Sequence, residues 1–463
     1  MRWREALQPV RMARVAILAP SFTFRDVLVQ VADAGLVELN DERDERDGRS
    51  SGAVTSTATP DSRALNPEPP DPAQCHDRGR LDLLRGEEAL QARADQAVVD
   101  GEVAGLTGWM ESDLVTNLRQ RVAPTGGTVV ILPSPRGVDP PTQLRDAGMS
   151  RDFDPLVQTY ATVPYDDVNP AALAGLAYVA MFGMMFADVG HGFLLLLIGL
   201  AVRSGWPTRL VRLRPVWLFL VGAGLSSMLF GLLYGELLGP TGVVPVIWMD
   251  PLQHPLPLLG ASVAVGGVLL AGAYGLGAVN RYREGGWPRV LVASAGIAGA
   301  TIFLAFGLVC LGLYVHSGVV LVSGSAVLVI GLAAAYSGLL NAAGGHAAGA
   351  AQAAVELFDV VTRLGSNVVS FARLAAFGLT HAALGLVIWQ ATSALSRGGP
   401  AGFLGAVVVF VVGNLIAFLL EGLVAAVQAL RLEYYELFSR VFEAYGRPFR
   451  PWHIPLSPME ESR

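Results

Sequence analysis

Lysine is absent from this chain of 463 residues, so all 33 of its basic residues are arginine. A P-loop needs a lysine to reach the nucleotide phosphates, and Schiff-base chemistry needs a lysine amine. The sequence therefore excludes a self-contained P-loop ATPase and a Schiff-base enzyme. Cysteine is scarce as well. Cys75 lies in a polar segment and Cys310 in an apolar one, so the sequence offers neither a disulfide framework nor a zinc motif.

Charge is also scarce, because 16% of the residues are charged whereas about 25% is typical of globular domains. The mean hydropathy is +0.47. Residues 290–315 contain no charged side chain, and an apolar run longer than about 18 residues predicts a membrane-spanning helix. The acidic residues concentrate before about residue 165. We therefore expect a polytopic protein of the cell membrane, mainly α-helical, with a small soluble N-terminal domain. The formal net charge of −6 does not indicate nucleic-acid binding.

The N-terminal residues 1–165 predict a small α+β domain. Residues 13–40 read as strand, helix and strand, with Gly35 as the helix stop. Residues 41–80 are polar and proline-rich, which predicts a flexible segment. Residues 81–122 have a helical pattern, and residues 128–133 predict a further strand. The domain shows no pattern typical of catalysis, so we expect it to make contacts rather than carry chemistry.

Residues 166–455 predict a membrane domain of about eight helices, followed by a short tail at 456–463. The first two spans are short and meet at residues 188–192, so they could also form one broken helix. The predicted spans are 170–186, 189–203, 213–238, 257–281, 289–315, 318–341, 354–394 and 401–441.

Arginine placement predicts the orientation of these spans. Arginines cluster between the second and third spans and between the fourth and fifth, whereas residues 239–256 contain none and residues 395–400 contain only Arg397. The positive-inside rule then places the N-terminal domain and the C-terminus in the cytoplasm.

The last two spans are unusually long. Proline is absent from 356–399 and again from 401–447. Each stretch could form one continuous helix of about 40 residues, or about 60 Å, whereas the hydrocarbon core is about 30 Å thick. We therefore expect both helices to be steeply tilted or to extend beyond the membrane, with a turn at Gly398, Gly399 and Pro400.

Ionisable and polar residues inside these two spans are costly and need a reason. The penultimate span contains Asp359, Arg373 and His381, and the last contains Glu421, Gln428 and Arg431. A step of eight residues advances about 12 Å along a helix, and a step of ten about 15 Å. Antiparallel packing then predicts an outer layer (His381, Glu421), a layer near mid-depth (Arg373, Gln428, Arg431) and an inner layer (Asp359).

This layered pattern favours a proton path. A guanidinium stays charged when poorly solvated, and it lowers the pKa of a nearby carboxyl, which promotes proton release. Two half-channels separated by such a barrier would need a mobile carboxylate on a partner protein. The alternative is a structural ion pair, in which Glu421 or Asp359 satisfies Arg373 for packing reasons.

Two further groups of polar residues have plain structural interpretations. His191 beside Asp188 has the look of a metal-binding fragment, but a turn between short spans explains the pair better. Glu236 could cap the end of a span. We therefore expect no metal and no cofactor.

Four ordered segments of the membrane part resemble one family. Residues 181–200 (MFGMMFADVGHGFLLLLIGL), 230–239 (FGLLYGELLG), 356–384 (ELFDVVTRLGSNVVSFARLAAFGLTHAAL) and 420–452 are similar to the membrane stator subunit of V-type and A/V-type rotary ATPases. This is the 116 kDa-type family, called subunit a or subunit I. Residues 14–39 are similar to the family's N-terminal strand–helix–strand.

The resemblance implies roles for particular residues. Arg373 matches the arginine required for proton translocation, and Arg431 the supporting arginine, with Gln428 nearby. His381 and Glu421 match the exit half-channel, and Asp359 matches the acidic position of the cytoplasmic half-channel. The implied partners are the proteolipid c-ring, peripheral stalk subunits, the lipid bilayer and, indirectly, the ATP-hydrolysing sector; no nucleic acid is implied. The polypeptide itself would hold no nucleotide.

The resemblance has one departure and leaves one alternative. Family members carry a much longer cytoplasmic domain, so we expect a shortened domain here, with fewer stalks or a different anchor. The alternative function is a stand-alone proton-coupled secondary transporter, for which inverted repeats are typical; the sequence shows no such repeat. An assembly remnant that moves no protons would be expected to lack the central arginines, and both are present.

Overall fold

A computed structural model describes most of the chain, and it divides into two compact units. One unit combines Pro9–Leu144 with Gly446–Arg463 and is called the sheet unit below; the other combines Met1–Gln8 with Arg145–Tyr445 and is called the helical unit. The described residues are 9–40, 63–135, 138–144, 153, 156–157, 159, 162–205, 214–292, 297–343, 347–441 and 446–457.

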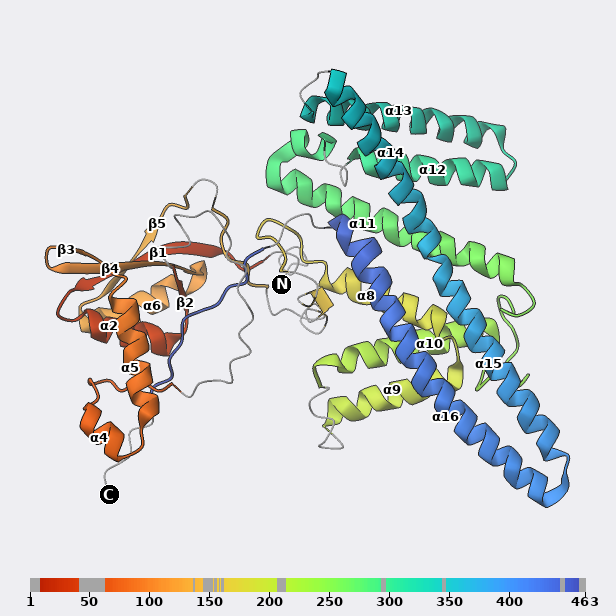
Figure 1. Ribbon diagram of the computed structural model, residues 1–463, viewed down its shortest axis with the longest axis horizontal. Coiled ribbons are helices and arrows are strands. Elements are labelled where there is room, and N and C mark those ends of the chain that lie inside the picture. The colour runs from red at the N-terminus through yellow and green to blue at the C-terminus, as the bar shows by residue number, and fades with distance from the viewer. Residues whose placement is uncertain are drawn as a thin grey trace. The chain divides into compact units, whose positions relative to one another are not determined.

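The sheet unit is built on an antiparallel sheet whose strands run in the order β2, β4, β1, β5, with β3 paired to β4. Helices α2, α5 and α6 pack beside it (Figure 1). The elements are β1 (Met12–Pro20), α2 (Phe24–Ala34), β2 (Val37–Leu39), α4 (Pro72–Asp77), α5 (Leu81–Ala94), β3 (Val98–Asp100), β4 (Val103–Glu111), α6 (Val115–Val122) and β5 (Thr128–Leu132).

The core of this unit lies between the sheet and α2. Val15, Ile17 and Ala19 are buried on β1 at the two-residue period of a strand, and they share one cluster with the buried face of α2. Helix α5 packs on α2, where Arg25 and Glu87 form a two-pronged ion pair with N–O distances of 2.8 and 2.6 Å. The predicted strand–helix–strand of residues 13–40 is confirmed, including the helix end at Gly35, whose φ is 57°.

Two expectations for this unit need correction. The helical pattern predicted over 81–122 is interrupted by the β3–β4 hairpin, because Asp100 and Gly101 supply a tight turn in which Gly101 has a φ of 61°. The predicted flexible segment 41–80 is ordered in part. Residues 41–62 lie outside the described residues, but 63–80 contain α4, whose first turn is capped by the Asp71 carboxylate.

The C-terminal residues 446–457 belong to the same unit. Trp452 N–H donates to the Val37 carbonyl at 2.8 Å, and Ser457 N–H donates to the Leu65 carbonyl at 2.9 Å. The side chain of Ile454 is 2% exposed and joins the core. Residues 446–457 therefore add to the core of a unit whose first strand begins at residue 12, without forming a strand of its sheet.

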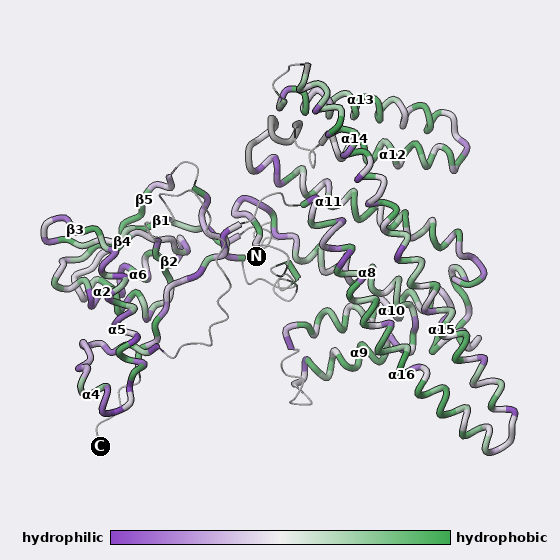
Figure 2. Tube along the Cα trace, viewed as in Figure 1, coloured by the Kyte–Doolittle hydropathy of each residue, from purple (hydrophilic) through white to green (hydrophobic). Residues whose placement is uncertain are grey.

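The helical unit consists of long apolar helices (Figure 2). Within the described residues, five helices are long and apolar enough to cross a membrane and three shorter ones are apolar, so the chain is a membrane protein. The count of eight spans stays a prediction. The helices are α8 (Ala171–Met185), α9 (Val189–Ser204), α10 (Trp217–Tyr234), α11 (Pro255–Val292), α12 (Ile297–Tyr314), α13 (Gly318–Ala342), α14 (Ala347–Ser370), α15 (Ala372–Ser396), α16 (Gly399–Leu432), a π-helix (Glu433–Phe438) and α17 (Ser439–Val441).

The first two predicted spans are two separate helices, α8 and α9, joined by residues 186–188. Helix α9 packs closely on α10 because glycines face each other at the contact. A Cβ atom at Gly224 would lie 2.7 Å from the Gly192 carbonyl oxygen. The predicted loop after residue 281 is instead part of α11, in which Gly286 has a φ of 69°, a backbone conformation that glycine adopts freely.

The last two long helices lie side by side and run antiparallel (Figure 1). The turn between them falls where it was predicted, with Gly399 at a φ of 77° and Pro400 in the first turn of α16. The prediction of unbroken helices needs correction at two places. Phe371 separates α14 from α15, and the π-helix follows α16. Neither break involves proline, so neither was evident in the sequence.

Candidate functional site

The site begins at Asp188, which connects three elements of the helical unit. One carboxylate oxygen accepts from the backbone N–H of His191 at 2.9 Å and so caps α9. The other accepts from the backbone N–H of Gly239, in the segment after α10, at 3.0 Å. Asp188 is fully buried, and both of its oxygens are held by backbone donors. Asp188 therefore has the structural role expected for a turn between two short spans, because its side chain caps α9.

His381 and Glu421 are in contact, as the antiparallel helix spacing predicts. The Nδ1 atom of His381 on α15 and the Oε2 atom of Glu421 on α16 form a hydrogen-bonded pair. His381 is 5% exposed. The pair therefore joins the two long helices in a water-poor place, where a charged hydrogen bond is strong.

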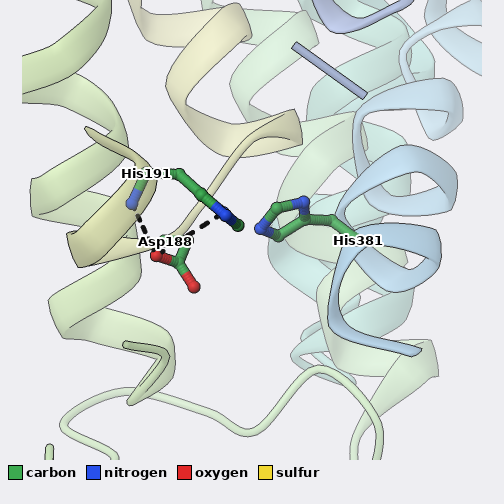
Figure 3. A group of neighbouring side chains, drawn as sticks. All are labelled: Asp188, His191 and His381. Atoms are coloured by element: carbon green, nitrogen blue, oxygen red, sulfur yellow. Dashed lines mark hydrogen bonds and ion pairs between the residues drawn. The ribbon is translucent and has the colours of Figure 1, made fainter. Parts of the chain in front are cut away.

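His191 lies against this pair (Figure 3). Its ring is edge-on to the ring of His381, with centroids 5.5 Å apart. Phe186 lies 5.0 Å from the His381 ring and 5.6 Å from the His191 ring, and Phe418 lies 5.9 Å from His191. Two imidazoles and two carboxylates thus gather from α9, α15 and α16 behind aromatic walls. Sequence reasoning singled out His381 and Glu421 but gave Asp188 and His191 only a structural role. The contact between the two pairs depends on how α9 packs, which the sequence does not show.

Arg373 lies two residues after the interruption at Phe371. Its Nη1 atom is buried and makes no hydrogen bond within the described residues. The charged groups that act on it are Arg431 and Glu436. The Oε1 atom of Gln428 is also buried without a hydrogen bond to the described residues. One cationic and one anionic group of the chain therefore act on Arg373, and the middle layer of Arg373, Gln428 and Arg431 stays a prediction.

Asp359 lies away from this centre. Its carboxylate pairs with Arg363 on the same helix at 2.5 Å, and its side chain is 51% exposed. Nearer the centre, Asn367 donates to Glu436 at 2.8 Å and accepts from Arg440, with its amide nitrogen facing the acceptors. Sequence reasoning did not single out Asn367 or Glu436. The four-residue spacing of Glu436 and Arg440 indicates that both side chains lie on one face of a helix. The sequence does not indicate that this face contacts Asn367 on α14.

Further carboxyl groups are buried in the helical unit, among them those of Glu433 and Glu236. Glu433 in the π-helix is 1% exposed, and its Oε2 atom has no hydrogen bond to the described residues. Glu236 follows α10, where its backbone N–H donates to Gly231 and its carbonyl accepts from Val189. The backbone of Glu236 therefore joins the end of α10 to the start of α9, and the capping role expected for its side chain stays a prediction.

The fold and the site together define a membrane protein whose paired long helices carry a series of ionisable groups, of which His381 is buried. The family model described as "V-type ATPase 116kDa subunit family" matches residues 105–208 and 358–454. The second of these segments includes all the predicted site residues from Asp359 to Arg431, and the first includes Asp188 and His191. Over these two segments the chain is similar to this family.

The curated relatives carry one printed name, A-type ATP synthase subunit I. The relative from Aeropyrum pernix is 27% identical over 69% of this chain and 51% of its own length. The relative from Archaeoglobus fulgidus is 25% identical over 80% of this chain and 62% of its own length. The relative from Halobacterium salinarum is 27% identical over 68% of this chain and 51% of its own length. The chain thus spans about half the length of the curated relatives it matches.

Proposed function

We propose that this chain is the proton-translocating stator subunit of a prokaryotic V/A-type rotary ATPase. The observation that carries the proposal is the arrangement on α15 and α16. Arg373 and Arg431 lie within electrostatic reach of each other, and the same two helices carry the hydrogen-bonded His381–Glu421 pair. The names of the relatives support the same function.

The exposed face of α16 supports a partner that carries carboxylates. Four apolar side chains spaced by four residues form an exposed row, and Arg431 is exposed at the next step of that row. An exposed guanidinium on so apolar a helix is costly unless an anion or water meets it. A ring of small proteolipids with buried carboxyls would supply that anion. The apolar members of the row are Leu415, Leu419, Leu423 and Val427.

The proposed mechanism follows from charge and position. A rotor carboxyl that arrives at Arg373 loses its proton, because the fixed positive charge favours the carboxylate. His381 and Glu421 relay that proton in the outer half-channel. Asp359 lies on the route to the cytoplasm, with Gln428 between the two sides. Each half-channel is then closed to the other by the two arginines, so the proton crosses only on the moving rotor.

The sheet unit and the C-terminus lie in the cytoplasm in this proposal. The sheet unit would contact the peripheral stalks, and the chain itself would hold no nucleotide. ATP hydrolysis or synthesis belongs to the soluble sector of the complex.

Purification from native membranes tests the function. We would tag the chain, extract it with mild detergent, and ask whether a small proteolipid and ATPase activity accompany it. Both are expected. A chain that purifies alone under these conditions would overturn the rotary function and favour a stand-alone proton-coupled transporter.

A further inference from the structure

The side chains of Asp188, His191 and His381 form a cluster that the proton path does not fully use. One ligand atom from each of these residues lies within 4.8 Å of the others, and all three residues are buried. We propose that this cluster binds a divalent transition-metal ion of the Zn²⁺ class.

The His191 ring is the strongest sign of a ligand. His191 is 2% exposed, and its Nδ1 atom lies 3.7 Å from Asp188 Oδ1, which is too far for a hydrogen bond. Neither ring nitrogen makes a hydrogen bond of normal length within the described residues. A buried polar group without a partner costs about 1–3 kcal/mol, so buried histidines are normally satisfied. Figure 3 shows this ring facing His381, with the Asp188 carboxylate beside it. A metal ion placed between them would satisfy His191.

The other two ligands are held in place by their neighbours. Asp188 is fixed by the backbone N–H groups of His191 and Gly239. Glu421 holds the Nδ1 atom of His381, so the Nε2 atom of that ring remains for a metal. A histidine that binds a carboxylate with one nitrogen and a metal with the other is a common arrangement, because the carboxylate orients the ring and makes it a better ligand.

The donor set determines the class of ion. Two imidazoles and one carboxylate suit Zn²⁺ and its neighbours, whereas Mg²⁺ and Ca²⁺ prefer oxygen ligands alone. Zinc–ligand bonds of about 2.0–2.1 Å require donor atoms about 3.3 Å apart, so the side chains must move slightly closer on binding. Three protein ligands leave one position for water, and the rings of Phe186 and Phe418 limit access to it.

The consequence for transport rests on the proposed function, although the binding itself does not. A metal on His381 would prevent this ring from relaying protons. We therefore expect Zn²⁺ to inhibit ATP-driven proton uptake by the intact complex.

The experiment measures binding separately from transport. We would titrate the purified full-length chain in detergent with Zn²⁺ by calorimetry. The test variant is His191→Gln, which keeps a polar side chain, and the matched control is His254→Gln, an exposed histidine of the same unit. One Zn²⁺ per chain is expected, with affinity lowered about tenfold or more in His191→Gln and unchanged in His254→Gln. Equal affinity in the wild type and His191→Gln would overturn the site.

A second measurement covers the case in which His191→Gln does not fold. The wild-type chain would be loaded with Co²⁺ and its ligands identified by X-ray absorption. Two imidazole ligands are expected, and a sphere of oxygen ligands alone would overturn the site. Zn²⁺ that binds with two imidazoles and leaves proton uptake unchanged would instead contradict the relay role of His381. Absence of Zn²⁺ binding with normal proton uptake would overturn the metal site and leave the proposed function standing.

Discussion

At the scale of single residues, the important distinction is between charges that are paired inside the chain and charges that are not. His381 has Glu421, and Asp359 has Arg363. The charged groups that act on Arg373 are Arg431 and Glu436, and its buried Nη1 atom makes no hydrogen bond to the described residues. This arrangement argues against the structural ion pair that the sequence left open, because neither Glu421 nor Asp359 forms an ion pair with Arg373 in the described structure. A partner's carboxylate would complete the site.

Arg373→Ala is expected to reduce ATP-driven proton uptake about a hundredfold or to background, since a fixed charge at the reacting group is removed. Uptake would be followed by dye quenching in membrane vesicles, with the amount of co-purifying proteolipid as the check on assembly. The matched control is Arg397→Ala, which removes an exposed arginine at the end of the same helix and should leave uptake unchanged. Normal uptake by Arg373→Ala would contradict the mechanism.

At the scale of elements, close helix contacts position the site. The start of α9 carries Asp188 and His191, and α9 packs on α10 through Gly192 and Gly224. In a membrane, the hydrophobic effect does not drive helices together, so their association depends on close van der Waals packing. Small residues such as glycine allow the two backbones to come close enough for this packing. Gly239 similarly approaches Gly385 on α15, where an added Cβ atom would lie 2.8 Å from the carbonyl oxygen. These contacts bring α9 and α15 to the same cluster.

Gly224→Val is expected to destabilise the helical unit by about 1–3 kcal/mol, because the added atoms overpack the contact. Its Cβ would lie 2.6 Å from the backbone nitrogen of Leu196. Thermal unfolding of the detergent-solubilised protein would show a lower midpoint. Gly275→Val is the control, since an added Cβ atom at this position of α11 has no neighbour within 4 Å. Equal losses in the two variants would indicate that helix propensity, rather than packing, is responsible.

At the scale of the whole molecule, the two ends of the sequence fold as one unit. Residues 446–457 pack on the sheet that begins at Met12. Glu38 on β2 holds this segment: it accepts from the Arg450 N–H at 2.7 Å and pairs with Arg447 at 3.0 Å. Burial raises the pKa of Glu38 above its ordinary value, despite the opposing effect of these contacts. The sheet unit therefore cannot be complete until residues 446–457 have been made.

The pKa of Glu38 predicts how the attachment of this segment depends on pH. Its pKa is higher in the folded state, so its stabilising contribution is fully present below the unfolded-state value near 4.5 and declines as the pH rises through the folded-state value. Hydrogen exchange at the Trp452 amide, corrected for intrinsic rates, should show protection that weakens as the pH rises over that window. Glu38→Gln should remove the dependence, whereas Glu102→Gln at the far turn of the sheet should retain it. Protection that increases with pH in the wild type would contradict the prediction.

The sequence alone determined much of the architecture. The apolar runs marked the helices to within a few residues in most cases, because residues that face lipid must be apolar along a whole span. The strand–helix–strand of residues 13–40 was visible in its local periodicity and its glycine stop. The ionisable residues of the last two helices stood out because such groups are rare in spans. The eight- and ten-residue steps between them were enough to pair His381 with Glu421.

Only the tertiary structure decided which distant segments meet. Asp188 and His191 lie 190 residues or more before His381 in the sequence, and the two groups meet because glycine contacts set the position of α9. Residues 446–457 attach to the sheet unit through backbone hydrogen bonds, which leave no mark on residue type. The interruption at Phe371 and the Asn367–Glu436 contact depend on how α14 and the π-helix pack. The local sequence pattern predicts whether a side chain faces the protein interior or its surroundings. The packing of the whole unit determines which residue it contacts there.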